Sequence, residues 1–168
     1  MPGMTPTAQN DAAARQLLRH TLATLAYRAG KVLRDAPAEF ANFRVYERTR
    51  TPGQILAHLG DLLEWADSIA KGKEEWHDSP VVDWEKGIQR FFAALKNLDA
   101  RLASNQALQV ECEKLFQGPI ADALTHVGQI AMLRRIAGAP VRGENYYRAE
   151  IAVGRVALEQ SAPVREFD

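Results

Sequence analysis

Four long segments of the chain repeat apolar residues every three or four positions, and proline, glycine or short polar stretches separate them. This spacing predicts amphipathic α-helices, because residues three and four apart lie on one face of a helix. The predicted helices cover about residues 11–35, 51–72, 83–104 and 118–137. Such helices bury their apolar faces only against one another. The pattern therefore predicts an all-α fold, a four-helix bundle, as one domain over residues 1–168.

The residues between the segments predict where the helices begin and end. The run TPGQ at residues 51–54 places a hydroxyl at the N-cap, proline in the first turn and glutamine three residues later, which forms a capping box. Gly118 and Pro119 are predicted to open the last helix. Residues 73–82 lack an apolar period, and a connector of this length predicts a crossover between the second and third helices.

The two ends of the chain carry weaker signals than the helices. Residues 1–10 are predicted to form a flexible N-terminus. Residues 143–168 form a C-terminal tail whose pattern is compatible with a short helix or a packed loop. The apolar stripe of the first predicted helix consists of Leu17, Leu18, Thr21, Leu22, Leu25 and Ala26. We expect this stripe to face the core.

Charge and composition narrow the classes of partner. Lysine plus arginine and aspartate plus glutamate each number 21, so the formal net charge is zero. A balanced surface has no long-range attraction for nucleic acid or anionic lipid, and neither is an expected partner. No stretch approaches the ~18 consecutive apolar residues of a membrane span, and the N-terminus lacks a signal-peptide pattern. Cys112 is the only cysteine, so no intrachain disulfide forms. Together these features make the cytoplasm the expected location.

The last predicted helix carries an acidic and an imidazole group one turn apart. Asp122, His126 and Gln129 fall on one stripe at about 100° per residue, flanked by apolar residues. An ionised carboxylate near a buried face costs several kcal/mol unless a partner offsets the desolvation. A divalent cation is one such partner, and two ligands one turn apart are a common way to hold it. The alternative is a local Asp122–His126 ion pair, which contributes only tenths of a kcal/mol when exposed.

A third candidate ligand lies on the second predicted helix. His58 falls on the apolar face of that helix, between Ile55 and Leu62. Alone, it is best read as a core histidine whose ring nitrogens are satisfied by neighbouring groups. Together with Asp122 and His126 it completes a two-histidine, one-carboxylate set with open coordination positions. We therefore predict one divalent metal ion, with zinc or nickel ahead of iron or manganese.

Several polar residues near this set have two readings each. Asp61 is expected to be a solvated helix charge rather than an acceptor that orients His58. Gln129 would hydrogen-bond either a water on the metal or a backbone group. Arg134 would either clamp an anionic substrate or complement the dipole of its own helix, and for Arg135 the dipole reading is favoured. Cys112 is expected to be structural.

The runs TPGQILAHLGDLLEW and ADALTHVGQIAMLRRIAGAPV resemble the DinB-like superfamily over most of residues 10–142. That resemblance implies a four-helix bundle with a long crossover between helices two and three. It also implies a divalent metal held by one histidine of helix two and two ligands four apart on the last helix. The usual first ligand on the last helix is histidine, whereas this chain has Asp122. An acidic residue there resembles the mycothiol-dependent maleylpyruvate isomerase branch, which implies thiol-dependent transfer or isomerisation.

Three functions remain open from the sequence. The first is a metal-dependent enzyme for a small-molecule substrate, in which the ion acts as a Lewis acid. It would be either a hydrolase or a thiol-dependent S-transferase or isomerase. The thiol-dependent reactions would use a low-molecular-weight thiol as co-substrate. The second is a non-catalytic metal-binding or stress-associated bundle in which the ion adds folding free energy. The third is a helical interaction module without metal. Because twofold assemblies are the commonest oligomers, a homodimer is the expected assembly.

Overall fold

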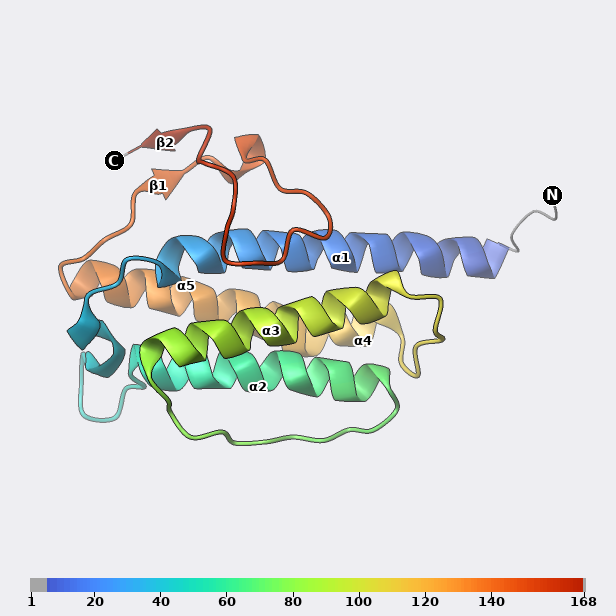
Figure 1. The fold of residues 1–168 in the computed structure, drawn as a ribbon, viewed down its shortest axis with the longest axis horizontal. Helices are drawn as coiled ribbons and strands as arrows, with labels where there is room; N and C mark the ends of the chain where they lie inside the picture. Colours follow the sequence, from blue (N-terminus) through green and yellow to red (C-terminus); the bar gives the residue numbers. More distant parts are fainter. Residues whose placement is uncertain (1–5, 168) are drawn as a thin grey trace.

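The computed structural model describes residues 6–167 and is predominantly helical, as the apolar spacing predicts (Figure 1). The long helices are α1 (Pro6–Leu33), α2 (Pro52–Ala70), α3 (Trp84–Ala103) and α5 (Ala121–Ile136). Of the segment predicted to be flexible, residues 1–5 lie outside the described residues, and residues 6–10 begin α1. None of the described helices has the length and apolar character that crossing a membrane requires.

The remaining elements are short. They are η1 (Ala38–Asn42), α4 (Cys112–Leu115), the π-helical turn η2 (Phe116–Ile120), η3 (Tyr146–Arg148), β1 (Gly143–Glu144) and β2 (Glu166–Phe167). The two strands pair antiparallel, with Gly143 opposite Phe167 and Glu144 opposite Glu166. Strand structure is thus confined, among the described residues, to one two-residue pair within the C-terminal tail.

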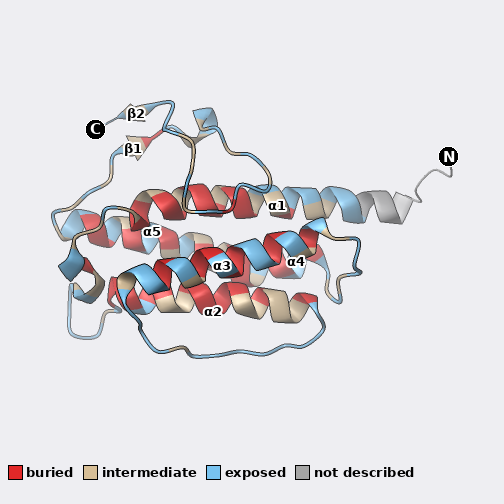
Figure 2. Ribbon diagram, in the orientation of Figure 1, coloured by how far each residue is buried: buried red, intermediate tan, exposed pale blue. Residues whose placement is uncertain are grey.

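The core lies between the four long helices. Helix α2 packs against α3 and α5, and α1 packs against the same two helices. Figure 2 shows the buried residues concentrated on the sides that the helices turn toward one another. Side chains with no measurable exposure are contributed by every long helix, among them Leu22, Leu25, Leu59, Leu63, Phe91, Leu95, Leu98 and Ile130. Burial of this apolar surface is the main favourable contribution to folding.

One residue of the stripe predicted for the first helix does not face the core. Leu18, Leu22 and Leu25 are buried, whereas Leu17 is 67% exposed. Successive residues are about 100° apart around a helix, so Leu17 lies beyond the edge of the face that Leu18 begins. The spacing of apolar residues was compatible with a stripe that includes Leu17. The rotation of α1 about its own axis decides that Leu17 faces away from the core.

Helix α2 begins at the predicted capping box. The backbone N–H of Thr51 donates to Gln54 Oε1 at 2.8 Å, and the Gln54 N–H donates to the Thr51 hydroxyl oxygen at 3.2 Å. The helix ends at Ala70, and Gly72 follows with φ of 77°, a left-handed conformation that favours glycine. The start of the helix that carries His58 is therefore encoded locally, by four consecutive residues.

The helical run that leads into α5 begins earlier than predicted, at Cys112. Gly118 and Pro119 do not open it but lie inside η2, which joins α4 to α5 without a break in the chain. Proline lacks an amide hydrogen, and a π-helical turn, with its longer hydrogen-bonded loop, accommodates the missing donor. Cys112 and Leu115 are buried, so the extra turn contributes to the core. Apolar packing upstream thus overrides a local breaker signal.

The connector between α2 and α3 has no helix or strand and runs back along α2 in Figure 1. The Ser79 N–H donates to Asp61 Oδ2 at 3.1 Å, and Arg90 donates to Asp61 Oδ1 at 2.6 Å. Asp61 is buried, so the expectation of a solvated charge was wrong. Burial favours a higher pKa for Asp61, but the hydrogen bonds from Ser79 and Arg90 outweigh it and lower the pKa. This carboxylate anchors the connector and does not orient His58.

The C-terminal tail is a packed loop fastened to α1. Buried Glu144 accepts a hydrogen bond from the Tyr27 hydroxyl at 2.6 Å and pairs with Lys31 at 2.8 Å. Lys31 also pairs with Glu166 at 2.7 Å. The Tyr146 ring meets the Tyr27 ring edge-to-face, with 6.2 Å between centroids. The tail therefore covers α1, and Tyr146 packs there.

Arg134 has a role that neither sequence reading included. Its buried guanidinium donates to the carbonyl oxygens of Val32 at 3.2 Å, Arg34 at 2.7 Å and Asp35 at 3.2 Å, and to that of Ala139 at 2.8 Å. The last carbonyls of a helix have no partner within the helix. Arg134 therefore caps the C-terminus of α1 from α5 and is not available to a substrate.

We expect Arg134→Met to lower the free energy of unfolding by about 2–4 kcal/mol, because buried carbonyl groups lose their donors. The exposed neighbour Arg135 supplies the control, and Arg135→Met should change stability by less than about 0.5 kcal/mol. Urea unfolding followed by circular dichroism measures both. Equal losses in the two variants would contradict the capping role.

Candidate metal centre

His58 on α2 and the pair Asp122 and His126 on α5 meet at one point. One ligand atom from each residue lies within 4.8 Å of the other two. Asp122 bridges the imidazoles, with Oδ2 at 3.5 Å from His58 Nε2 and Oδ1 at 3.4 Å from His126 Nε2. The structure therefore brings together the three residues singled out in the sequence. Among the described residues, they form the only cluster of histidine, cysteine and acidic groups arranged to hold an ion.

These separations can be tested against the bond lengths of a metal site. Zinc bonded to nitrogen and oxygen at about 2.0–2.2 Å in tetrahedral geometry keeps neighbouring ligand atoms roughly 3.4 Å apart. Asp122 has this separation from each imidazole, through a different carboxylate oxygen in each case. The two imidazoles are nearly perpendicular, at 89°, with 4.7 Å between ring centroids. The cluster could therefore hold a metal ion with small side-chain adjustments.

The local structure of α5 sets the positions of two ligands. Asp122 and His126 are four residues apart, so their side chains project from successive turns of one face. The π-helical turn η2 ends at Ile120, two residues before Asp122. Such turns shift the register of the residues that follow and occur often at functional sites.

Gln129 holds the ring of His126. Its Oε1 lies 2.9 Å from His126 Nδ1, so the amide oxygen accepts and Nδ1 carries the hydrogen. That tautomer leaves the Nε2 lone pair free on the side of Asp122. Metal-binding histidines commonly have such a partner on the other ring nitrogen. Neither of the two roles considered for Gln129 is observed. Its amide oxygen contacts His126, the candidate metal-binding residue itself.

The three side chains differ in exposure. The imidazoles of His58 and His126 are 20% and 12% exposed, whereas the Asp122 carboxylate is 46% exposed. Asp122, expected at or near the buried side of its helix, lies at the rim of the centre. Burial lowers the pKa of His58, and the charges of His126 and Arg50 lower it further. A neutral imidazole is the form that binds a metal.

Two tryptophans form an aromatic wall beside His58. Trp76, from the connector, meets His58 and Trp65 edge-to-face, with 5.6 Å between ring centroids in each pair. A slot of about 440 Å³ opens here, lined also by Leu62, Glu74 and Asp122. The Trp65 Nε1 hydrogen is the one buried side-chain polar group in the described part of the chain without a hydrogen-bond partner. The sequence did not predict this wall.

A second pocket opens on the His126 side. It has a volume of about 460 Å³ and is lined by Thr49, Arg50, Ile55, His126, Gln129, Met132 and Leu133. Sequence reasoning missed Arg50. Arg50 directly precedes the N-cap of the helix that carries His58, and this position in the sequence could have indicated it.

The other two histidines and the cysteine do not belong to the cluster. His20 and His77 are exposed. Cys112 is buried, and burial raises the pKa of its thiol, which agrees with a structural role. Tyr147 is exposed on the tail.

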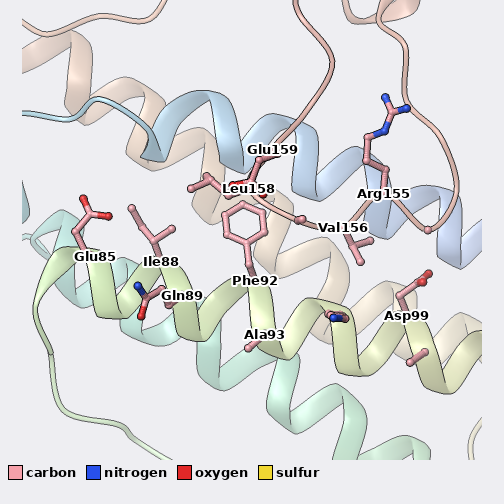
Figure 3. Close-up of a pocket in the computed structure, with 14 residues that line it drawn as sticks. Glu85, Ile88, Gln89, Phe92, Ala93, Asp99, Arg155, Val156, Leu158 and Glu159 are labelled. Atoms are coloured by element: carbon pink, nitrogen blue, oxygen red, sulfur yellow. The ribbon is translucent and has the colours of Figure 1, made fainter.

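A larger cavity than these two, about 790 Å³, lies elsewhere, between α3 and the tail (Figure 3). Its acidic residue Asp99 accepts from Arg19 at 2.9 Å, so that carboxylate is already paired. Phe92 and Val156 make its wall largely apolar. The candidate site is therefore chosen by the convergence of ligating atoms and not by the size of a cavity.

No protein-family model, no curated protein and no solved structure matches the chain. The resemblance to the DinB-like superfamily stays a prediction from the sequence motifs. Functional inference therefore depends on the geometry of the centre.

We expect Gln129→Ala to weaken zinc binding about tenfold or more, because His126 loses the contact that orients its ring. Gln89→Ala, an exposed glutamine of α3, is the matched control and should leave the affinity unchanged. Competition with a chromogenic chelator measures both affinities. Indistinguishable affinities in the two variants would show that Gln129 does not support the site.

Proposed function

We propose that this chain is a metal-binding four-helix bundle of the DinB-like kind. His58, Asp122 and His126 would hold one divalent ion, zinc or nickel ahead of iron or manganese. The observation that carries the proposal is the convergence of two imidazoles and a carboxylate from two helices, with ligand atoms within 4.8 Å of one another. Nitrogen donors with a single carboxylate suit these borderline metals better than magnesium or calcium, which prefer oxygen ligands.

The surroundings of the centre favour a metal-dependent enzyme for a small molecule. Three protein ligands leave coordination positions open, and the centre borders pockets on its His58 and His126 sides. When bound, the ion supplies Lewis acidity to a substrate or thiol. Gln129 orients His126, and Trp76 packs edge-to-face against His58.

The unpaired indole N–H of Trp65 gives a further argument for a ligand. A buried donor without a partner costs about 1–3 kcal/mol. Trp65 lines the slot that also includes His58 and Asp122. The nitrogen itself is buried, so an acceptor on a ligand in the slot would offset that cost only after a neighbouring side chain shifts. Structural proteins rarely retain such a group without a reason.

The reaction class depends on Asp122. In the resemblance, an acidic residue at this position implies thiol-dependent transfer or isomerisation, with a low-molecular-weight thiol as co-substrate. A metal-dependent hydrolase needs no thiol. We favour the thiol-dependent reaction, because Asp122 replaces the usual histidine with an acidic residue, as in the mycothiol-dependent maleylpyruvate isomerase branch that the sequence resembles.

A non-catalytic metal protein is the second candidate. The ligands belong to α2 and α5, so a bound ion would cross-link two helices and add folding free energy. The exposed rim position of Asp122 suits such a clamp as well as it suits catalysis.

The metal proposal predicts about one equivalent of metal per chain in untagged protein analysed by inductively coupled plasma mass spectrometry. His126→Ala should lose the metal, whereas His77→Ala, which alters an exposed connector histidine, should retain it. Asp122→Asn should lose metal while changing stability by less than about 1 kcal/mol, because the carboxylate lies at the rim. Asp122→His should retain metal. Equal metal content in all variants, or none in the wild type, would contradict the proposal.

The enzyme proposal predicts thiol-dependent transfer onto small electrophiles that disappears with chelation and returns with zinc. A panel of low-molecular-weight thiols and electrophiles, followed by loss of free thiol, tests it. His126→Ala should be inactive and His77→Ala fully active. A fully occupied site without turnover on any thiol would favour the non-catalytic clamp.

A further inference from the structure

Arg50 occupies a defined place beside the candidate metal centre. It directly precedes Thr51, whose backbone N–H and hydroxyl are both held by Gln54 in the capping box. The backbone at Arg50 is therefore anchored to the start of α2. Its side chain lines the 460 Å³ pocket together with His126 and Gln129. The same pocket thus contains the candidate metal-binding residue His126, Gln129, which orients it, and the cationic Arg50.

The guanidinium of Arg50 is not used within the fold. It is exposed and has no hydrogen bond or ion pair with any of the residues the structure describes. The interior arginines Arg19, Arg90 and Arg134 each have partners. A cation that lines a pocket and is unpaired can bind an anionic group of a ligand.

The rest of the lining restricts what that anion can be. Arg50 is the only permanently charged residue of the pocket, and Ile55, Met132 and Leu133 make the walls apolar. One guanidinium neutralises one negative charge and pairs with a carboxylate through two parallel hydrogen bonds. A phosphate dianion would leave a negative charge against apolar walls, which is unfavourable. On the other side of the centre, Glu74 lines the aromatic slot and would repel an anion.

We propose that this pocket is the subsite for the carboxylate of a small substrate, held by Arg50 next to His126. The subsite rests on the proposed function, because it would place the substrate at the metal. The substrate is then a monocarboxylate with a short apolar body. Arg50 sets specificity through charge and fork geometry, and Gln129 and His126 form the inner wall.

Binding of three probes to zinc-loaded protein tests the subsite. Butyrate provides the carboxylate, butyramide is its neutral isostere, and inorganic phosphate is the alternative anion. Isothermal titration should show butyrate binding that Arg50→Gln weakens about tenfold to hundredfold. Arg50→Lys should fall between, since an ammonium group lacks the planar fork. The matched control is Arg48→Gln, an exposed arginine of the same connector outside the pocket, which should bind butyrate like the wild type.

The outcomes separate this inference from the metal proposal. Zinc content is measured first in each variant and should be unchanged, because Arg50 is not a ligand. Full zinc occupancy with equal butyrate affinity in the wild type and Arg50→Gln overturns the subsite and leaves the metal proposal standing. Tighter binding of phosphate than of butyrate, or equal weakening by Arg48→Gln, also overturns it. Absence of zinc in the wild type overturns the metal proposal, and titration of the metal-free protein then shows whether Arg50 still binds the carboxylate.

Discussion

The packing of α2 against α5 holds two helices from distant parts of the chain at the separation where their polar side chains meet. Leu59 and Leu63 of α2 and Ile130 of α5 are completely buried on these two helices. A rotation of either helix by one residue, about 100°, would turn its ligand away from the other helix. The apolar core therefore does more than stabilise the fold, because its register determines whether His58 and His126 can share an ion.

Buried polar contacts fasten the rest of the chain around this pair of helices. Arg134 caps α1 from α5, Asp61 of α2 anchors the connector, and Glu144 ties the tail to α1. Each joins segments far apart in the sequence. Breaking one partner of such a contact leaves a desolvated group behind, so these contacts select one arrangement of the helices over others.

The residues that shape the centre's surroundings come from the segments at either end of α2. Trp76 arrives from the connector after the helix, and Arg50 from the connector before it. Connecting segments held by rigid helices commonly carry binding residues. Here one side of the centre is aromatic and the other cationic, so the two sides favour different parts of a ligand.

The sequence by itself determined the helical elements and the start of α2, because apolar spacing and the capping box act between residues a few positions apart. It also indicated His58, Asp122 and His126 as a set, since spacing and residue type carry that signal. Only the tertiary structure decided that Asp61 is buried and that Arg50 borders the centre. Those outcomes depend on how each helix is rotated about its axis and on contacts between distant segments, and no local pattern in the chain encodes them.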